Sequence, residues 1–242
     1  MAVHLVPPPV RVYRVARPTR PFNWSAPREP LPASEGPVFE GRRWDDPEGS
    51  FATVYCGTSP EAAFAETIAP FRRVSGLRER IFEATDEDEP DPTYDFDDPE
   101  GIVPVGYFER ALGYALVDED VRFIDVDDAR THNELNARFG ELLEELGAGR
   151  QFDRGLVMTQ DRRVTRRVAG FLYEHYRHEA MGIRYESRLM SDLECWALWP
   201  QAQVAVYDVD VEPISPETPA LVEAAERLGV LLPPLDHISR VR

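Results

Sequence analysis

Apolar residues recur at every third or fourth position in two long stretches of the chain, a spacing that places side chains on one face of a helix. The pattern predicts helices over residues 128–146 and 161–179, and a shorter terminal helix is predicted over residues 216–228. The expected apolar face of the first helix comprises Leu135, Phe139, Leu142, Leu143 and Leu146, and that of the second Val164, Val168, Phe171, Leu172 and Tyr176.

Another helix is predicted over residues 60–69, directly after a strand-like segment. Ser59 is a candidate N-cap with proline at the first helical position, and Thr58 with Glu61 forms a competing capping box. Pro70 ends or kinks this helix, because proline lacks a backbone N–H and clashes with the preceding turn.

Short apolar runs between these helices predict strands. They span residues 10–15, 51–56, 107–117, 121–126, 183–185, 194–199 and 203–209. Helices interleaved with many short strands indicate an α+β fold, with a central mixed or antiparallel sheet and flanking helices. Because the chain has 242 residues and no internal repeat, we expect a single domain over residues 1–242.

The net charge of the chain limits the classes of ligand that the protein is expected to bind. The formal net charge is −17, and nine of the acidic side chains lie in residues 86–100, which we expect to be an acidic flexible insertion. Such a charge argues against a general nucleic-acid-binding protein, which needs a basic surface. An anionic ligand stays compatible, because all 27 basic side chains are arginines and a guanidinium can bind a phosphate through two parallel hydrogen bonds.

The remaining composition adds few constraints. Cys56 and Cys195 lie in apolar strand-like segments, so buried thiols are favoured over a disulfide, and the five scattered histidines form no metal-binding spacing. The N-terminal residues lack the features of a signal peptide, and no apolar run reaches transmembrane length. We therefore expect a cytoplasmic protein with no membrane partner and no metal, and leave a homo-oligomer open.

Motifs far apart in the sequence carry the candidate chemistry. The first lies at residues 41–45 (Gly-Arg-Arg-Trp-Asp) and continues through a strand–helix unit at residues 53–66; the second lies at residues 182–188 (Gly-Ile-Arg-Tyr-Glu-Ser-Arg). Together they place an arginine, a tyrosine, a glutamate and a serine on short strand, turn and helix elements. This set is suited to holding a dinucleotide and cleaving its glycosidic bond.

The arginine of the first motif is the candidate phosphate ligand. Arg43 precedes Trp44 in a turn-like segment, where its guanidinium could clamp a pyrophosphate through charge-assisted hydrogen bonds. It could equally be a surface arginine paired with Asp45 or Asp46. Local sequence does not choose between Arg42 and Arg43.

Glu66 is distinguished by its neighbours on the predicted helix. The positions three and four residues away hold Ala62, Ala63, Ala69 and Pro70, none of which can pair with a carboxylate. The small residues leave room for the close approach of a ligand, and tight packing against another surface would explain them as well.

Tyr55, Ser187 and the arginines beside Ser187 complete the candidates. Tyr55 could stack on a flat ring or orient Glu66, or it could be a core aromatic. Ser187 could hydrogen-bond a sugar, orient a catalytic neighbour or cap a turn; no Ser-His-Asp arrangement accompanies it. Arg184 and Arg188 flank Ser187 and are further candidates for phosphate contact.

A second group of arginines, Arg162, Arg163, Arg166 and Arg167, lies along one side of the predicted helix over residues 161–179. We expect these side chains to form a solvated face that pairs with the acidic insertion. Contact with phosphates or with an acidic partner is the alternative.

The order and separation of these motifs resemble the RES-domain family, which is named for its Arg, Glu and Ser. The similarity runs from residues 12–15 to residues 194–198 and is sharpest at residues 43–44, 55–66 and 183–188. Members of this family are bacterial toxin–antitoxin toxins that degrade NAD, and their fold is related to that of ADP-ribosyltransferases. The resemblance therefore implies NAD as the substrate and a cognate antitoxin as a partner.

The resemblance also implies a role for each candidate. In the family the motif arginine precedes Trp or Phe, which selects Arg43 to hold the diphosphate. Glu66 stands at the place of the family's glutamate and would stabilise the oxocarbenium-like ribose as neutral nicotinamide leaves. Tyr55 would contact the nicotinamide–ribose end, and Ser187 would orient the ribose or the site. One departure is Asp45, where the family frequently has Asn.

Alternatives remain for the reaction. Water as acceptor would give ADP-ribose and inorganic phosphate would give a phosphorylated ADP-ribose, and neither requires a cofactor beyond NAD itself. The same site logic also serves a protein-directed ADP-ribosyltransferase. A non-catalytic domain that binds a nucleotide or a partner is the alternative from a different class.

Overall fold

The computed structural model describes most of the chain. It describes residues 2–19, 21–24, 42–72, 101–145, 147, 149, 151–159 and 162–238. The expected acidic insertion at residues 86–100, Gly41 of the first motif and Asp161 at the start of a predicted helix lie outside the described residues.

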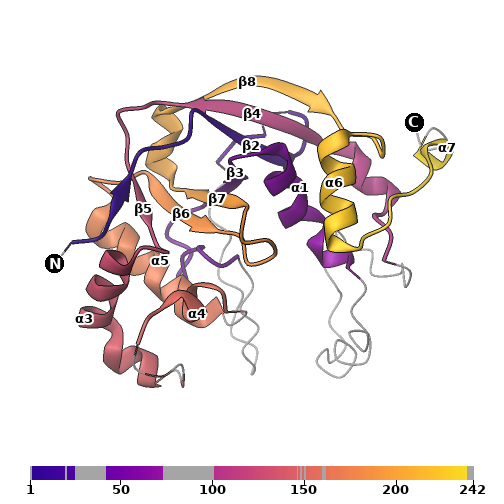
Figure 1. Cartoon of the computed structure of the whole chain (residues 1–242). Coiled ribbons are helices and arrows are strands. Elements are labelled where there is room, and N and C mark those ends of the chain that lie inside the picture. The colour runs from indigo at the N-terminus through magenta and orange to yellow at the C-terminus, as the bar shows by residue number, and fades with distance from the viewer. Residues whose placement is uncertain are drawn as a thin grey trace.

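A mixed sheet of eight strands organises the described chain (Figure 1). Its order is β1-β5-β6-β7-β3-β2-β4-β8, with β5 and β6 parallel and the other neighbours antiparallel. The strands are β1 (Leu5–Val6), β2 (Arg11–Ala16), β3 (Val54–Gly57), β4 (Ala111–Val117), β5 (Phe123–Asp125), β6 (Gly182–Glu186), β7 (Glu194–Leu198) and β8 (Val206–Pro213). The predicted α+β class, with a mixed sheet and flanking helices, is confirmed.

The α-helices are α1 (Pro60–Ile68), α3 (Ala129–Glu145), α4 (Arg154–Val157), α5 (Arg162–Tyr176), α6 (Pro219–Leu228) and α7 (Leu235–Ile238). Short 3₁₀ helices are η1 (Ala69–Phe71), η2 (Val105–Glu109) and η3 (Pro200–Val204). None of the helices within the described ranges combines the length and the hydropathy needed to cross a membrane.

Capping fixes the start of α1 as predicted. Ser59 is extended, and its hydroxyl accepts a hydrogen bond from the Ala62 backbone N–H at 3.1 Å. Thr58 is not the cap, because its hydroxyl donates to Glu194 at 2.8 Å and accepts from the Trp196 indole at 2.9 Å. The competition between the two caps is thus resolved in favour of Ser59.

Two strands begin later than predicted, because 3₁₀ turns occupy the first residues of the predicted ranges. Residues 107–109 belong to η2, where Tyr107 and Phe108 are buried by the turn, and β4 starts only at Ala111. Residues 203–204 belong to η3, which has proline at its start, and β8 begins after it. The periodicity of buried residues could not separate these turns from strand ends.

Two groups of helices cover the same face of the sheet. Tyr55 and Gly57 lie two residues apart on β3 and share that face, Ala197 on β7 pairs with Tyr55, and Tyr13 on β2 pairs with Gly57. We call this side, which bears Tyr13 and Tyr55, face A, and the opposite side face B. The apolar clusters around Ala197 and around Tyr13 therefore both lie on face A.

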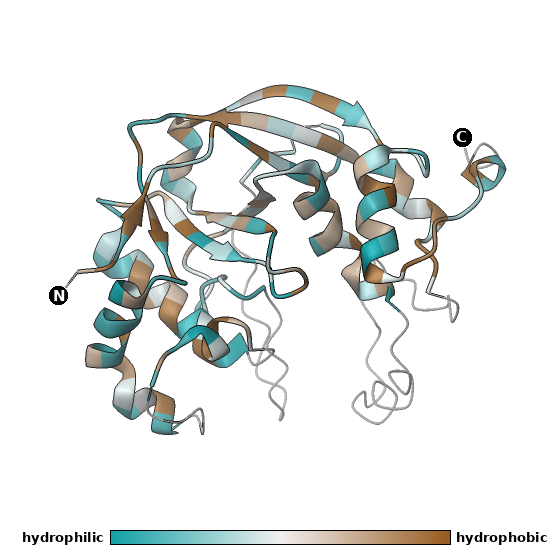
Figure 2. Ribbon diagram, viewed as in Figure 1, coloured by the Kyte–Doolittle hydropathy of each residue, from teal (hydrophilic) through white to brown (hydrophobic). Residues whose placement is uncertain are grey.

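Each helix group has its own apolar core. Helices α3 and α5 pack with β5, β6 and β7 around residues such as Leu135, Val168 and Ile183. Helices α1 and α6 pack with β2 and β4 around residues such as Phe64 and Leu221. Figure 1 shows these two groups at opposite ends of the sheet, and Figure 2 shows apolar residues along the strands between them. The middle strand β3 marks the boundary between the two groups.

Face B carries a third cluster, which includes Cys56, Phe123 and Trp196. Cys56 lies in this cluster and Cys195 lies on face A, and both are buried free thiols, as predicted.

Candidate active site

The predicted catalytic residues meet on face A, where the two helix groups adjoin. Glu66 comes from α1, Tyr55 from β3, Ser187 from the residue that follows β6, and Arg43 from the loop over residues 42–50. Each motif was short in sequence, but the antiparallel neighbours β6, β7 and β3 bring the segments together.

Ser187 and Glu66 form the link between the two sequence motifs. The buried Ser187 hydroxyl donates to Glu66 Oε1 at 2.6 Å, across 121 positions of the chain. The same oxygen of Ser187 accepts from the Leu189 backbone N–H at 3.1 Å, so the turn-capping role also holds. The Cys195 thiol lies 3.8 Å from Glu66 Oε1. Ser187 therefore fixes one oxygen of a carboxylate whose residue is otherwise exposed.

Arg43 lies close to this carboxylate without an ion-pair partner among the described residues. Its guanidinium donates to the Val157 carbonyl oxygen, and the alternative pairing with Asp45 or Asp46 does not occur. Burial lowers the pKa of Arg43, and the nearby cation of Arg188 lowers it further. The negative charge of Glu66 acts in the opposite direction. The desolvated guanidinium of Arg43 and the exposed Arg188 thus place two cations near Glu66.

Tyr55 is held by the Arg43 loop. Its hydroxyl donates to the Asp45 carboxylate at 2.8 Å and accepts from the Trp44 backbone N–H at 2.8 Å. The guanidinium of Arg42 lies 5.2 Å from the centre of the Tyr55 ring. Burial, followed by the Asp45 charge, raises the pKa of Tyr55 well above its ordinary value, so the hydroxyl stays protonated. Tyr55 orients Asp45 and the loop, and not Glu66 as one reading of the sequence suggested.

Arg184 lies on the other face. On β6, Tyr185 pairs with Cys195 on face A, so the neighbouring Arg184, which pairs with Trp196, points to face B. The structure therefore separates Arg184 from the cluster of Arg43 and Glu66, and only Arg188 of the two predicted second-motif arginines lies near it.

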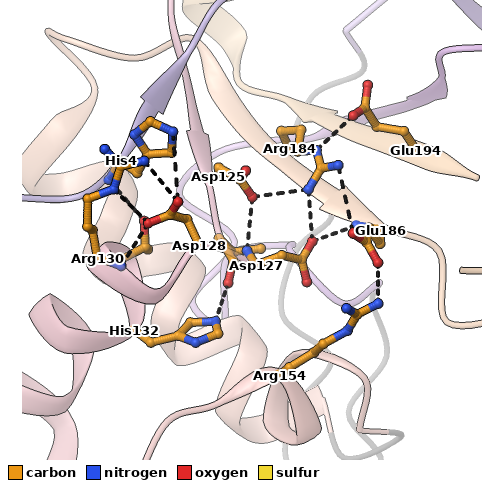
Figure 3. Close-up of polar contacts among 12 residues, drawn as sticks. His4, Asp125, Asp127, Asp128, Arg130, His132, Arg154, Arg184, Glu186 and Glu194 are labelled. Atoms are coloured by element: carbon orange, nitrogen blue, oxygen red, sulfur yellow. Dashed lines mark hydrogen bonds and ion pairs between the residues drawn. The ribbon is translucent and has the colours of Figure 1, made fainter. Parts of the chain in front are cut away.

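Carboxylates surround Arg184 (Figure 3). Its Nε donates to Glu194 at 2.8 Å, and its Nη1 donates to Asp125 at 3.2 Å and to Asp127 at 3.3 Å. Burial acts to lower the pKa of Arg184, but the Glu194 hydrogen bond and the surrounding negative charges raise it. The N–H donors and the charge of this guanidinium are already engaged by carboxylates. The predicted phosphate contact of Arg184 therefore has no support in this arrangement.

Asp127 and Arg154 extend this network. Asp127 Oδ2 accepts from the Glu186 backbone N–H at 2.7 Å, while its buried Oδ1 has no hydrogen-bond partner within the part of the chain that the structure describes. Burial raises the pKa of Asp127, against the opposing effects of the Glu186 N–H and the Arg184 charge. Arg154 donates to Glu186 (Figure 3), and Val157 at the other end of α4 accepts from Arg43. The short helix α4, which the sequence did not predict, therefore contacts both Arg43 of the candidate site and the network around Arg184.

Sequence reasoning missed several residues that build the site. Tyr185 is buried on face A, with its ring centroid 5.8 Å from that of Trp44. Asp45 holds Tyr55, and its departure from the family's frequent Asn was the available signal. Arg166 was assigned to a solvated face, but this assignment was wrong, because the side chain is buried and donates to the Asp46 carbonyl oxygen at 2.7 Å.

Other parts of the described surface offer less chemistry. Depressions of about 370 and 200 Å³ lie elsewhere, the first lined by residues including Arg110 and Pro213 and the second by residues including Pro8 and Val117. No group of three or more His, Cys, Asp or Glu side chains within the described ranges is arranged to hold a metal ion. The case for the site on face A rests on the side chains that meet there.

Comparison with protein families shows a match over most of this chain. The RES domain family matches residues 11–220 of this chain. Among solved structures, the crystal structure of the M. tuberculosis MbcT–MbcA toxin–antitoxin complex is similar, with 11% sequence identity, a TM-score of 0.47, and 93% of this chain and 92% of that chain covered. This structural similarity is too low to bear on function. The comparison with curated proteins gave no match.

Proposed function

Because the chain belongs to the RES-domain family, we propose that it is an enzyme that consumes NAD⁺ by cleaving the bond between nicotinamide and ribose. The observation that carries the proposal is the hydrogen bond between Ser187 and Glu66, beside which lies the cation of Arg43, with no ion-pair partner in the described parts of the chain. A carboxylate and two arginines that have no carboxylate partner among the described residues match the cationic and anionic parts of NAD⁺.

The charges of NAD⁺ suggest how these groups divide the work. The diphosphate carries negative charge, and Arg43 and Arg188 would bind it with planar guanidinium groups. The ribose next to nicotinamide develops positive charge as the glycosidic bond breaks, and Glu66 would stabilise that charge in the transition state. Nicotinamide leaves as a neutral molecule, so the leaving group needs no general acid.

Ser187 would act through Glu66. A hydrogen bond from a buried hydroxyl fixes the direction of one carboxylate oxygen, and Glu66 Oε2 has no hydrogen bond among the described residues. We propose that Oε2 faces the anomeric carbon of the ribose. An oriented carboxylate is worth more to the transition state than a mobile one, since it needs no reorganisation during the reaction.

The acceptor of the ADP-ribosyl group is either water or inorganic phosphate. In the first case water adds to the anomeric carbon and loses a proton, giving ADP-ribose; in the second, phosphate adds through an oxygen and gives a phosphorylated ADP-ribose. In both cases the carbon–nitrogen bond to nicotinamide breaks and its electron pair stays on the nicotinamide nitrogen.

We also propose that the protein acts as a toxin restrained by an antitoxin. Membership of the RES-domain family supports this proposal, because family members are toxins of toxin–antitoxin pairs. Growth arrest on expression of the wild-type chain, absent with Glu66→Gln, would support toxicity; normal growth with measurable NAD⁺ consumption in the cell would contradict it.

Chromatography of NAD⁺ incubations tests the activity itself. The wild-type protein, purified without a partner, is expected to release nicotinamide stoichiometrically with ADP-ribose in phosphate-free buffer or with a phosphorylated ADP-ribose when phosphate is added. ADP-ribose covalently attached to protein, with no free product, would instead indicate a protein ADP-ribosyltransferase. Intact NAD⁺ with a folded protein would overturn the proposal.

A further inference from the structure

Arg166 is a buried arginine that binds backbone oxygens of the Arg43 loop. It lies on α5 with 8% of its surface exposed. Its Nη2 donates to the Asp46 carbonyl oxygen at 2.7 Å, and its Nε lies 3.4 Å from the Asp45 carbonyl oxygen. The next residue, Arg167, is exposed, so two adjacent arginines of one helix have different surroundings. No local sequence pattern distinguishes the two residues.

A second feature of α5 supports the same loop. Gly170 is one helical turn after Arg166, and a Cβ at this position would lie 3.3 Å from Asp46 Oδ1 and 3.4 Å from Pro47 Cδ. The absence of a side chain therefore lets the loop approach the helix closely. Arg166 and Gly170 together form the surface on which the loop over residues 42–50 rests.

The loop has its own internal bonds at this point. The buried Asp46 carboxylate accepts from the Ser50 backbone N–H, and the Gly49 N–H donates to the Asp46 carbonyl oxygen at 3.3 Å. The same carbonyl accepts from Arg166, so the turn over residues 46–50 and its attachment to α5 share one oxygen. Loss of the guanidinium would leave this buried oxygen with a weaker set of partners.

Further contacts connect the residues held by Arg166 to the side chains proposed to bind the ligand. Asp45, whose carbonyl oxygen faces Arg166, uses its carboxylate to accept from the Tyr55 hydroxyl. Trp44 donates its backbone N–H to the same hydroxyl, and its ring packs against Tyr185. Arg43 follows directly before Trp44 in the chain. The backbone on both sides of this segment is thereby fixed between α5 and β3.

We propose that Arg166 is a positioning residue that holds the Arg43 loop in place for a ligand with a diphosphate. The positional part of this inference rests on the contacts of Arg166, and its consequence for the ligand rests on the proposed function. Arg166 would not touch NAD⁺. It would set the starting point of the Arg43 side chain, and so the affinity for the diphosphate.

The kinetic signature follows from the place of the diphosphate in NAD⁺. The diphosphate is remote from the glycosidic bond and is bound in the ground state and the transition state alike, so weaker contact raises KM more than it lowers kcat. We expect Arg166→Gln to raise KM for NAD⁺ by about tenfold, with kcat changed by less than about threefold. Arg166→Lys keeps the charge and should raise KM less. The matched control Arg167→Gln should behave as the wild type.

Hydrogen exchange supplies a measurement that does not depend on NAD⁺ cleavage. Amide protection at Gly49 and Ser50 should fall in Arg166→Gln and stay unchanged in Arg167→Gln, while protection of β6 and β7 is retained in both. If Arg166→Gln fails to fold, Arg166→Lys replaces it in both measurements. If the wild-type protein does not cleave NAD⁺, the proposed function is wrong. The hydrogen-exchange measurement then still tests whether Arg166 holds the loop. Unchanged exchange at Gly49 and Ser50, or an equal KM in the Arg166 and Arg167 variants, would overturn the inference.

Discussion

Arg43 and Arg184 lie beside the same sheet in opposite electrostatic surroundings. Arg43, beside face A, donates to a backbone carbonyl oxygen and has a lowered pKa because of burial and of Arg188. Arg184, on face B, contacts Glu194, Asp125 and Asp127, and its pKa is raised. Both were candidates for phosphate contact on sequence grounds, and the structure distinguishes them.

The difference separates a binding group from a structural one. A guanidinium that is desolvated and lacks a carboxylate partner keeps its charge available for an anion, at a cost to stability. A guanidinium surrounded by carboxylates has little left to offer a ligand, but it joins the strands that carry those carboxylates. Arg184 in this way ties β5, β6 and β7 together next to Ser187. The following predictions test this division.

The largest expected effect is on the reaction. Glu66→Gln removes the negative charge proposed to stabilise the ribose cation, so kcat for NAD⁺ cleavage should fall by about 10²–10³-fold. Nicotinamide release measured by chromatography gives kcat. The control is Glu61→Gln on the same helix, whose carboxylate pairs with Arg227, and it should retain wild-type kcat. A Glu66→Gln protein with nearly full activity would remove the carboxylate from the mechanism.

The free energy of unfolding should depend more on Arg184 than on Arg43. Arg184→Ala leaves Asp127 and its neighbours without their cation and should lower the free energy of unfolding by about 1–3 kcal/mol. Arg43→Ala removes a desolvated charge and should change that free energy by less than about 0.5 kcal/mol. Denaturant unfolding measures both. A larger loss for Arg43→Ala than for Arg184→Ala would reverse the comparison.

A smaller effect is expected for Tyr55→Phe. The change removes the hydroxyl that donates to Asp45 and accepts from Trp44, while the ring beneath Arg42 is kept. Losing one hydrogen-bonded anchor of the loop should raise KM for NAD⁺ by about three- to tenfold. Initial rates over a range of NAD⁺ concentrations measure this; wild-type KM in Tyr55→Phe would show that the hydroxyl does not position Arg43.

The smallest expected effect is on how the free energy of unfolding depends on pH, through Asp127 in the network around Arg184. Burial raises the pKa of Asp127 above its ordinary value of 3.8, so the folded state binds this proton more tightly than the unfolded state. Its contribution to stability is present at low pH and is lost as pH rises through the raised pKa. The unfolding free energy of Asp127→Asn minus that of wild type should therefore increase over this range.

Asp128 provides a control of opposite sign. Hydrogen bonds from Arg130 lower its pKa, so its contribution is present above the ordinary carboxyl pKa and is lost as pH falls. The corresponding difference for Asp128→Asn should decrease as pH rises through the ordinary value. Unfolding free energies at a series of acidic pH values measure both variants, and slopes of the same sign would contradict the assignment.

The local signals in the sequence were sufficient for much of the fold. Ser59 and Pro60 set the start of α1, and the apolar spacing located α3 and α5 to within a few residues. Turns that bury aromatic residues, such as η2 with Tyr107, share the apolar pattern of strands, so their boundaries could not be predicted. Helix α4 has only four residues, too few for a periodic pattern.

The site was predictable to the extent that it follows from motifs. The resemblance implied that Ser187 orients the ribose or the site, and the structure places the Ser187 hydroxyl within hydrogen-bonding distance of Glu66. The face of each residue was not predictable without the register of β6, because a shift by one residue exchanges Arg184 and Tyr185 between faces. The burial of Arg166 depends on a contact with residues 120 positions away, which no local pattern contains.

Binding of NAD⁺ to a catalytically impaired protein tests the division between the two arginines most directly. In a Glu66→Gln background, calorimetric titration should show NAD⁺ binding that weakens by about tenfold or more when Arg43→Ala is added. Adding Arg184→Ala to the same background should leave the Kd within about twofold, provided that each protein is folded at the temperature used. Binding that survives Arg43→Ala, or that is lost with Arg184→Ala, would contradict the account.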